Sequence, residues 1–431
     1  MKFHLITLGC SKNTSDSESL ANAFTRRGWE WSEKAGEANL VLVNTCGFIK
    51  DAKEESLNVV IKTLELKKSG NTKVCVFGCL VKRYRAAIEK EIPEIDFLYE
   101  FLSDKDIEHL TNLMTGGKPL DSLDHNKSWR FFTPNHIGIL KIAEGCSNLC
   151  TYCAIPGIRG PFQSRPEKQI LDDAVKLAKS GAVELCIVAQ DITRYGTENN
   201  GICQLPPLVR KLSKIEEIRW IRLHYMHPRG LTKNIIDDLY SIPKVVPYFD
   251  IPFQHVSDRM LRLMNRHTPP DHLKALIKHI RRNFKNSAIR TTFIVGFPGE
   301  NEEEFQELLD FIENFPLDRV GAFAYSTEEG TPASHIIPKV PSQTKQNRLD
   351  RLMTLQQLLI EERNRRLINK KVELIIDKVE ADHIEARTKW DAYEVDNLTR
   401  VIDYKYDLQP GQIVEGKIIS ADAYDFTAEI L

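Results

Sequence analysis

Residues 138–153 have the sequence GILKIAEGCSNLCTYC, in which an apolar strand is followed closely by three cysteines. Cys146, Cys150 and Cys153 have the spacing Cys-x3-Cys-x2-Cys. Three thiolates in one loop cannot complete a zinc tetrahedron or a four-cysteine cluster by themselves. They can bind three irons of a [4Fe–4S] cube and leave the fourth iron open to chelate the amino and carboxylate groups of S-adenosylmethionine. A zinc loop with a distant fourth ligand, or three buried thiols, also fits this spacing.

Strand and helix patterns alternate from this stretch to about residue 338. The expected strands are residues 138–142, 185–189, 220–224, 248–251, 291–295 and 320–324. Six strand–helix units of this spacing predict an open, partial (β/α) barrel. A long amphipathic helix is expected over residues 342–370. After it, short strands at 372–376, 384–386, 412–419 and 425–430 predict a small all-β barrel.

The residues before this stretch also alternate between strand and helix patterns. The expected strands are residues 3–8, 40–44 and 74–77, and the expected helices are 17–27 and 51–68. This alternation predicts a parallel sheet that helices cover on both faces. Cys10, Cys46 and Cys79 each come just after one of the strands, at the edge of a parallel sheet where ligands bind. We therefore expect three thiols at one rim, although buried structural thiols fit the pattern equally.

The patterns together predict an α/β protein with several parts. The expected parts are an N-terminal parallel α/β domain at 1–115, a linker at 116–134, a partial (β/α) barrel at 135–341, a connecting helix at 342–366 and a C-terminal β-barrel at 367–431. The linker is expected because its residues are rich in glycine, proline and polar side chains.

Composition narrows the class of protein. The chain has 431 residues, 42 % hydrophobic and 28 % charged, which suits several globular domains. Its 59 Lys and Arg against 60 Asp and Glu give a formal charge of −1, which excludes a globally basic nucleic-acid coat. Without an apolar run of about eighteen residues or a secretory signal, we expect a cytoplasmic protein with no membrane span. In that reducing compartment, the nine cysteines predict metal ligands, catalytic thiols or buried residues rather than disulfides.

Several blocks of the sequence resemble the methylthiotransferases of the radical S-adenosylmethionine superfamily. These blocks are LGCSKNTSDSE (8–18), NTCGFIKDAKEES (44–56), FGCLVKRY (77–84), CSNLCTYCAIPGIRGPFQSRP (146–166), DIPFQHVSDRMLRLMNR (250–266), TTFIVGFPGE (291–300) and AYSTEEGTPA (324–333). They occur in order and span nearly the whole chain. The resemblance implies a radical S-adenosylmethionine barrel in the centre and a TRAM-like C-terminal barrel.

The resemblance also implies two [4Fe–4S] clusters and S-adenosylmethionine as cofactors. Cys146, Cys150 and Cys153 would bind the first cluster, where S-adenosylmethionine is split to a 5′-deoxyadenosyl radical. Cys10, Cys46 and Cys79 match the family's ligands for an auxiliary cluster, which holds the sulfur that becomes the methylthio group. We expect no catalytic side chain beyond these cluster ligands, because the cofactors carry out the difficult steps. Cys75, Cys186 and Cys203 are assigned to packing or to chance occurrence.

Contacts to S-adenosylmethionine are expected from residues at barrel strand ends. The candidates are Tyr152, Gln190, Arg222, Ile294 and Gly296. Asp191, His224 and His255 lie nearby in the sequence, and for the two histidines a place in the core or at its rim fits equally well.

Two branches of the family differ in substrate. One modifies isopentenyladenosine in transfer RNA, and the other modifies the β-carbon of an aspartate in the small-subunit ribosomal protein numbered twelve. LGCSKN at residues 8–13, CGFI followed by KEES at 46–56, and Glu328 and Glu329 within the block at 324–333 resemble the protein-modifying branch. That branch implies an electron donor such as flavodoxin or ferredoxin and a source of sulfur.

The charge of the C-terminal barrel supports the same branch. Residues 367–431 hold eight Lys and Arg against fourteen Asp and Glu, a net charge of −6. An acidic module repels transfer RNA and attracts a basic protein, with Trp390 and Tyr393 as expected anchors for a protein loop. The transfer RNA enzyme is the alternative, and a non-enzymatic iron–sulfur scaffold or RNA-binding module is a third hypothesis.

Overall fold

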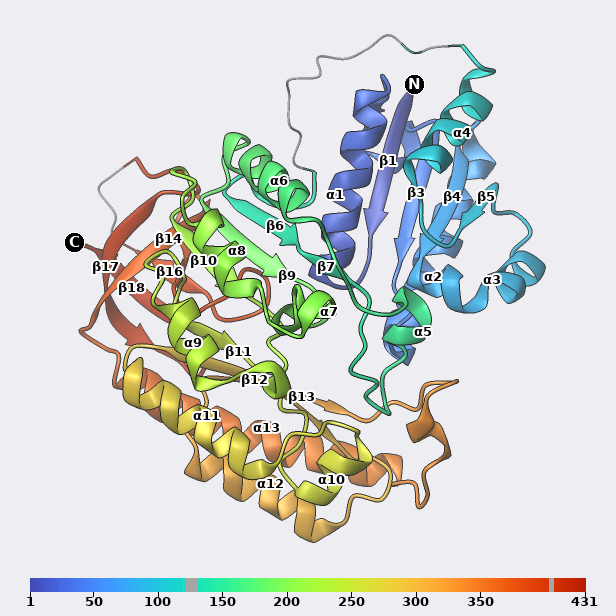
Figure 1. The fold of residues 1–431 in the computed structure, drawn as a ribbon. Helices are drawn as coiled ribbons and strands as arrows, with labels where there is room; N and C mark the ends of the chain where they lie inside the picture. The colour runs from blue at the N-terminus through green and yellow to red at the C-terminus, as the bar shows by residue number, and fades with distance from the viewer. Residues whose placement is uncertain (119, 121–130, 403–406) are drawn as a thin grey trace. The chain divides into compact units, whose positions relative to one another are not determined.

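The structure is a computed structural model of residues 1–431 that describes all of them except 119, 121–130 and 403–406 (Figure 1). Most of the predicted linker at 116–134 therefore lies outside the described residues. The chain divides into two compact units. The first consists of Met1–Thr133, Glu144–Ser147 and Cys153–Phe162, and the second of Pro134–Ala143, Asn148–Tyr152 and Gln163–Leu431.

The first unit is built on a five-stranded parallel sheet with strand order β2-β1-β3-β4-β5. The strands are β1 (Lys2–Thr7), β2 (Glu30–Trp31), β3 (Leu40–Thr45), β4 (Lys73–Gly78) and β5 (Phe97–Tyr99). Every residue of β3 is buried, as expected for the central strand of a sheet with two covered faces. The predicted parallel sheet is thus confirmed, and the sequence analysis missed only the short edge strands β2 and β5.

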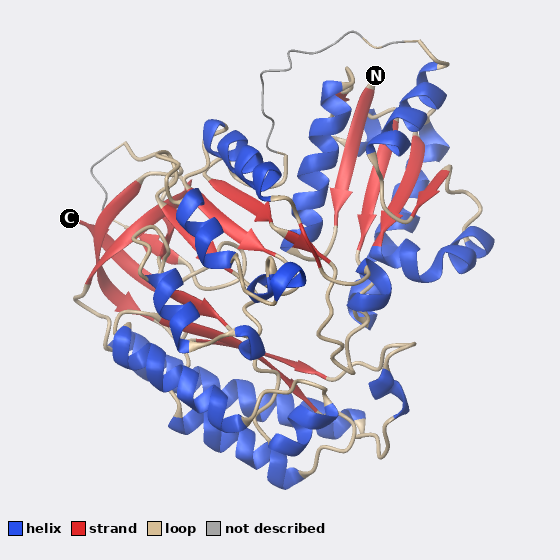
Figure 2. Ribbon diagram, in the orientation of Figure 1, coloured by secondary structure: helices blue, strands red, loops and turns tan. Residues whose placement is uncertain are grey.

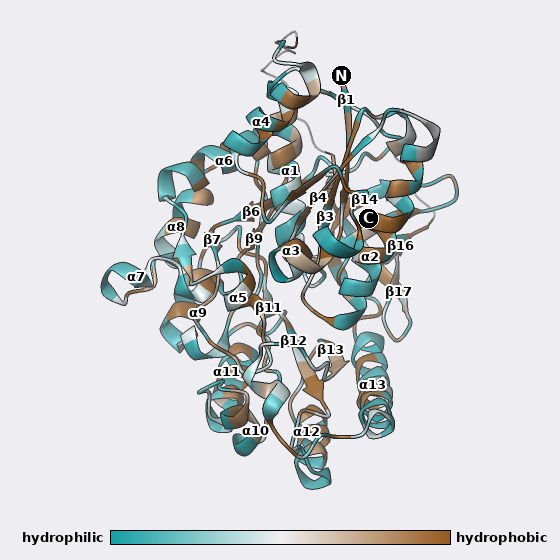
Figure 3. Ribbon diagram, turned by 90° about the vertical axis from the view of Figure 1, so that its right-hand side faces the viewer, coloured by the Kyte–Doolittle hydropathy of each residue, from teal (hydrophilic) through white to brown (hydrophobic). Residues whose placement is uncertain are grey.

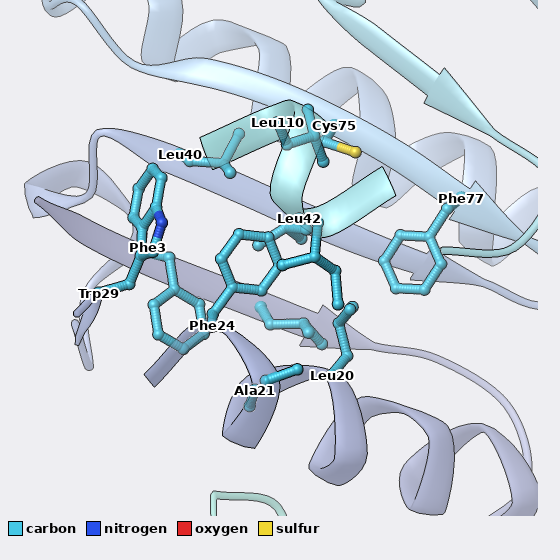
Figure 4. Close-up of a cluster of buried hydrophobic side chains, with 13 residues drawn as sticks. Phe3, Leu20, Ala21, Phe24, Trp29, Leu40, Leu42, Cys75, Phe77 and Leu110 are labelled. Carbon is cyan, nitrogen blue, oxygen red and sulfur yellow. The ribbon is translucent and has the colours of Figure 1, made fainter. Parts of the chain in front are cut away.

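Helices cover both faces of this sheet. The helices are α1 (Ser11–Arg26), α2 (Lys50–Leu64), α3 (Cys79–Glu91) and α4 (Asp104–Thr115). On one face, α1 and α4 pack against the sheet around Phe3, Phe24 and Leu42, as Figure 4 shows. On the other face, α2 and α3 pack around Val43 and Val76. The strands of the sheet are coloured as hydrophobic in Figure 3, which agrees with burial from both sides.

The second unit contains six parallel strands in two groups of three, with orders β10-β9-β6 and β11-β12-β13. They are β6 (Ile137–Lys141), β9 (Glu184–Val188), β10 (Trp220–Leu223), β11 (Tyr248–Asp250), β12 (Ala288–Val295) and β13 (Arg319–Ala324). Each coincides with a predicted strand, which confirms the open (β/α) arrangement. A parallel bridge between Ile221 and Val245 lies just before β11.

Helices connect and cover these strands (Figure 2). They are α6 (Glu167–Lys179), α7 (Thr197–Asn200), α8 (Leu205–Leu212), α9 (Lys233–Tyr240), α10 (Asp258–Leu263), α11 (Pro270–Asn283), α12 (Glu302–Asn314) and α13 (Ser342–Arg365). Helix α13 contacts β12, β13 and α12. It ends five residues before the predicted end at 370.

The C-terminal residues form a closed five-stranded barrel, as predicted, with strand order β14-β15-β16-β18-β17. Its strands are β14 (Lys371–Val379), β15 (Ile384–Thr388), β16 (Thr399–Val401), β17 (Ile413–Ala421) and β18 (Phe426–Ile430). Leu374, Ile384, Ile418 and Phe426 are among the buried side chains that fill it. Only the three-residue strand β16 was not predicted.

A buried ion-pair network joins this barrel to the parallel strands within the second unit. Glu184 of β9 accepts hydrogen bonds from Arg222 of β10 at 2.6 Å and from Arg387 of β15 at 2.8 Å. All three side chains are buried. Burial acts to raise the pKa of Glu184, but the charges of Arg387 and Arg222 lower it to about 2. The Glu184 carboxylate is therefore a counter-charge shared by two buried guanidinium groups, and Arg387 has a second one in Asp377 at 2.6 Å.

We expect Glu184→Gln to lower the free energy of unfolding by about 3–5 kcal/mol, because it leaves the buried guanidinium of Arg222 without a carboxylate, whereas Arg387 keeps Asp377. Urea denaturation followed by tryptophan fluorescence measures this loss. The control is Glu415→Gln, which removes the exposed pair with Lys371 and should cost less than about 1 kcal/mol. Because the folded-state pKa of Glu184 is lowered, its contribution is present above about pH 4.5 and is lost as the pH falls toward 2. A loss no larger than that of the control would contradict this role.

Candidate functional site

Three cysteines lie at the carboxyl edge of the N-terminal sheet. Cys46 and Cys79 directly follow β3 and β4, and Cys10 lies three residues after β1. These three strands are neighbours in the sheet, so the predicted position of the cysteines at one rim is confirmed. The thiols are close enough that the charges of Cys10 and Cys79 act on the pKa of Cys46.

Glycines allow the chain to close around these thiols. Gly9 has a φ of +94°, and a Cβ atom there would lie 2.9 Å from the Sγ atom of Cys46. A Cβ atom at Gly47 would lie 2.7 Å from the backbone nitrogen of Leu80. Both distances are too short for a side chain, so glycine is required for this close approach.

Two of the cysteines are at the N-termini of helices. Cys10 is the N-cap residue of α1, and Cys79 is the first residue of α3. Desolvation acts to raise the pKa of Cys10, but the charge of Lys12 and the backbone N–H groups of Asn13 and Lys12 outweigh it, so this pKa is lowered. Helix N-termini favour anions, so this arrangement suits thiolates.

Burial has the opposite effect on the other two thiols. It raises the pKa of Cys46 to about 11, despite a hydrogen bond from the backbone of Phe48. It also raises the pKa of Cys79, although the charge and a hydrogen bond of Arg159 act to lower it. Bound metal would hold both as thiolates, because coordination deprotonates a thiol.

Ser56 of α2 holds the Cys46 backbone in place. Its hydroxyl accepts a hydrogen bond from the Cys46 N–H at 3.0 Å and donates one to the Cys46 carbonyl at 2.9 Å. Asn44 lies one residue before the end of β3, and its side-chain amide donates a hydrogen bond to the Ser17 hydroxyl of α1 at 2.9 Å. The rim is therefore fixed by buried polar contacts as well as by the sheet.

The donor set at this rim fits a [4Fe–4S] cluster with one iron free of protein ligands. Among the described residues, no three His, Cys, Asp or Glu side chains converge on a single metal ion. A cube takes each thiolate at a different iron, so its ligands surround a larger volume than the ligands of one ion do. The three thiols, the glycines that admit them and the helix N-termini all suit such an anionic cluster.

The cysteine triplet lies in the loop before α5 (Ile155–Arg159). Cys146 and Cys153 belong to the first unit and Cys150 belongs to the second. In the first unit, the Cys146 N–H donates to the Gly160 carbonyl at 3.1 Å. In the second unit, Asn148 donates to the buried carboxylate of Asp191 at 2.7 Å. Asp191 therefore anchors the triplet loop to the end of β9.

Two residues that were predicted to contact S-adenosylmethionine pack on one apolar cluster. Tyr152 and Ile294 both contact the cluster that contains Met260, Met264 and Phe297. An aromatic ring from the triplet loop and an aliphatic residue of β12 therefore pack on the same apolar cluster. Apolar surface of this kind can accommodate the adenine of a nucleoside.

Gly296 lies at a tight turn directly after β12. It has a φ of +69°, and its N–H donates to the carboxylate of Glu300 at 2.8 Å. Gln190 follows β9 and is partly buried. These positions are at the carboxyl ends of barrel strands, where ligands of this fold bind.

The guanidinium of Arg222 is occupied by contacts within the protein. Besides Glu184, it donates to the Lys389 carbonyl at 2.9 Å and lies 4.7 Å from the centre of the Tyr248 ring. Its expected contact with S-adenosylmethionine stays a prediction, and these contacts give it a structural role.

The two histidines have partners within the second unit. The Nδ1 atom of His224 is 3.4 Å from the carboxylate of Asp250. His255 is fully buried, its Nδ1 atom accepts a hydrogen bond from the Ser257 N–H at 3.0 Å, and burial lowers its pKa to about 4. These contacts suit histidines in the core or at its rim, which was one of the two alternatives. The other was contact with S-adenosylmethionine.

Two arginines at the cysteine sites were missed. Arg159 of α5 donates to the side chains of Asp16 and Asn13, and Arg266 donates to the Sγ atom of Cys150 at 3.8 Å and to the Tyr152 hydroxyl at 3.4 Å. Both side chains are nearly fully buried. The spacing of residues in the sequence does not reveal that a single arginine is buried. The only signal for these two was that each lies inside a block that resembles the family.

Trp390 and Tyr393, the expected anchors for a protein loop, make contacts within the second unit, and their role as anchors stays a prediction. Trp390 is partly buried and packs against the barrel core, and its Nε1–H donates to the Asn286 carbonyl at 2.9 Å. Tyr393 lies under the guanidinium of Arg387, 5.4 Å from it. A cavity of about 310 Å³ next to Trp390 is lined by both the barrel and the parallel strands. These aromatic residues therefore join parts of the second unit.

Comparison with known protein families gives three matches along the chain. Residues 2–100 match the model of the uncharacterized protein family UPF0004, residues 140–312 match the radical SAM superfamily, and residues 368–431 match the TRAM domain.

Several curated relatives that match this chain over its whole length share one name. Proteins named ribosomal protein uS12 methylthiotransferase RimO are 40 % identical in Caldicellulosiruptor saccharolyticus, 39 % in Clostridioides difficile and 41 % in Thermodesulfovibrio yellowstonii. Each alignment covers 100 % of this chain and at least 99 % of the relative.

A solved structure shares the fold. The radical S-adenosylmethionine methyltransferase TsrM from Kitasatospora setae, with cobalamin and a [4Fe–4S] cluster bound, has a TM-score of 0.57 at 13 % identity. The match covers 77 % of this chain and 76 % of that protein.

We expect Cys10 to be the most reactive rim thiol in the metal-free protein. Its lowered pKa and its exposure increase the fraction of accessible thiolate at neutral pH, whereas burial raises the pKa of the other two rim thiols, Cys46 and Cys79. Brief iodoacetamide treatment at pH 7.5 followed by peptide mass spectrometry measures the order of alkylation. Raising the pH toward 11 should increase alkylation of Cys46 more than that of Cys10. A rate for Cys46 or Cys79 at pH 7.5 that equals or exceeds that of Cys10 would contradict this order.

Proposed function

The chain belongs to the RimO family of radical S-adenosylmethionine methylthiotransferases, and we propose that it adds a methylthio group to the β-carbon of an aspartate in the small-subunit ribosomal protein uS12. One observation carries the proposal: relatives of that name match this chain over its whole length. The six cysteines, which lie at strand ends and in a single loop, support it.

Six cysteines are assigned as cluster ligands within this proposal. Cys146, Cys150 and Cys153 hold the [4Fe–4S] cluster that binds S-adenosylmethionine, and Cys10, Cys46 and Cys79 hold an auxiliary cluster. When bound, these cofactors supply hydrogen abstraction from an unreactive C–H bond and the methylthio group that replaces the hydrogen.

The protein's own residues fix the loop and shield the site. The hydrogen bond from Asn148 to Asp191 holds the triplet loop at the end of β9, and Arg266 orients Cys150 and Tyr152 by donating to both. A hydrogen bond from a guanidinium to a cluster sulfur also offsets part of the negative charge of the thiolates.

The apolar residues have a separate task. Tyr152 and Ile294, with Gly296 and Gln190 at the neighbouring strand ends, form the proposed contacts with S-adenosylmethionine. Their apolar surface would exclude water from the reacting atoms, which a carbon radical needs in order to react with its substrate alone.

The charge of the barrel supports a protein substrate. Residues 367–431 carry a net charge of −6, which disfavours the phosphates of transfer RNA. Ribosomal proteins bind RNA and are basic as a class, so an acidic barrel attracts uS12. We therefore propose uS12 as the protein partner and expect no partnership with transfer RNA.

Other parts of the proposal concern the setting of the reaction. An electron donor such as flavodoxin or ferredoxin and a source of sulfur are required by the chemistry.

Among the described residues, no helix is long and apolar enough to cross a membrane. We propose a cytoplasmic location, where ribosomes are made, and keep the domain boundaries of 1–115, 135–341 and 367–431.

The direct test is anaerobic reconstitution followed by mass spectrometry of reactions that contain either uS12 or undermodified transfer RNA. We expect a gain of about 46 Da, the mass of CH₃S in place of H, on one aspartate of uS12 and none on the RNA. The same gain on transfer RNA adenosine would overturn the choice of substrate. S-Adenosylmethionine cleavage without a gain on either would contradict the assignment of uS12.

A cysteine variant separates the two proposed clusters in this assay. Cys79→Ser should still cleave S-adenosylmethionine but should lose the methylthio gain by at least about 100-fold, because only the auxiliary site is damaged. Cys203→Ser, which alters a cysteine at neither site, is the control and should keep both activities. Full methylthio transfer by Cys79→Ser would contradict its role as a ligand.

A further inference from the structure

We propose that Arg159 is a positioning residue of the auxiliary site, whose guanidinium joins the two helix N-termini that carry Cys10 and Cys79 and thereby sets the geometry and reduction potential of the cluster held there. The proposal rests on the assignment of Cys10, Cys46 and Cys79 as cluster ligands. It adds a residue from the segment that follows the cysteine triplet to the auxiliary site of the first unit.

The contacts of Arg159 reach both helices. Its Nη1 donates to the carboxylate of Asp16 at 2.8 Å, and its Nη2 donates to the side-chain oxygen of Asn13 at 2.7 Å. Both acceptors are in the first turns of α1, which begins directly after Cys10. Helix α5, which carries Arg159, packs against α3, whose first residue is Cys79, and the charge of Arg159 acts on that thiol. The Arg159 segment therefore connects the two helices, α1 and α3, whose N-termini carry Cys10 and Cys79.

The link continues into the strands of the sheet. Asn13, which accepts from Arg159, donates through its own Nδ2 to the Leu8 carbonyl just after β1 at 2.8 Å. Its backbone carbonyl accepts from the side chain of Asn44 at the end of β3 at 3.2 Å. The positions of the ends of β1 and β3 are thus tied to the same arginine, and Cys46 follows β3 directly.

Burial makes these contacts specific. The Arg159 side chain is only 6 % exposed and lies over the ring of Phe101, with 4.5 Å between the guanidinium carbon and the ring centre. A buried guanidinium must have its N–H groups satisfied by the protein, and its planar fork fixes the direction of each partner. Glu144, 3.5 Å away, is a second carboxylate near the charge. An ammonium group in the same place would keep the charge but lose the fork.

The charge of Arg159 faces a concentration of negative charge. Three thiolates and a bound cluster form an anionic centre in a partly buried place, and a nearby cation or hydrogen bond to sulfur favours its reduced form. Arg159 supplies such a cation beside Cys79. Its removal should therefore lower the reduction potential of the auxiliary cluster and loosen its binding.

A simpler role is an ion pair with Asp16 that only stabilises the fold. The two roles differ in what a change at Asp16 does. Asp16→Asn would weaken the ion pair but leave the cation at Cys79, so the reduction potential should stay constant or rise. A purely structural pair predicts that Asp16→Asn and Arg159→Gln have the same effect.

The experiment uses the full chain with Cys146→Ala, Cys150→Ala and Cys153→Ala, so that only the auxiliary cluster is present after anaerobic reconstitution. In this background we compare Arg159→Gln, Arg159→Lys and Asp16→Asn. The control is Arg85→Gln, because Arg85 is an exposed arginine on α3 whose partner is Glu89. The midpoint potential is measured by a redox titration followed by electron paramagnetic resonance, and cluster retention by the rate of iron loss to a chelator.

We expect Arg159→Gln to lower the midpoint potential and to speed iron loss by about 10–100-fold. Arg159→Lys should restore much of the midpoint potential but less of the cluster retention. Lysine keeps the positive charge but lacks the planar guanidinium that donates to several partners at once. Asp16→Asn should not lower the potential, and Arg85→Gln should change neither quantity.

Three results would overturn the proposal. They are an unchanged potential and retention in Arg159→Gln, an equal fall in potential in Asp16→Asn, or an equal effect of Arg85→Gln. If Arg159→Gln does not fold, as judged by circular dichroism, the lysine and Asp16 variants decide by the same criteria. If the parent chain without the triplet binds no cluster, the ligand assignment itself fails, which is a different outcome from a wrong role for Arg159.

Discussion

The structure depends on one constraint, which is that three thiols must be held together at the carboxyl edge of a parallel sheet. Burial opposes their ionisation, as the raised pKa values of Cys46 and Cys79 show. The first unit offsets this cost with helix N-termini, backbone N–H groups and a buried guanidinium. The glycines beside the cysteines follow from the same constraint, because no side chain fits where the chain closes around the sulfurs.

In the second unit, a buried arginine likewise lies beside a cysteine. Arg266 donates to the Cys150 sulfur, and the charge of Arg159 acts on Cys79 in the first unit. Both arginines come from family-like blocks of the sequence. In the same unit, the Glu184 network joins the acidic barrel to the parallel strands through buried charges. The barrel is therefore firmly attached to the strands whose ends carry the proposed S-adenosylmethionine contacts.

The sequence predicted much of the fold because its strands are buried apolar runs, which stand out without knowledge of their partners. Strands β2, β5 and β16 have only two or three residues, too few to show a pattern. The thiol rim could be predicted because strand ends in a parallel sheet share an edge, whatever the detailed contacts. The burial of Arg159 and the packing of Trp390 could not be predicted, because whether an isolated long side chain is buried depends on tertiary contacts that sequence spacing does not encode.

The central claim is that the chain holds two clusters on two separate sets of three cysteines. Mössbauer spectroscopy and iron analysis of ⁵⁷Fe-reconstituted protein test it most directly, with Cys10→Ala, Cys46→Ala and Cys79→Ala combined in one variant. The account predicts about eight irons per wild-type chain and about four in the variant, whose remaining cluster still changes its spectrum when S-adenosylmethionine binds. An unchanged iron content in the variant, or only four irons in the wild-type chain, would contradict it.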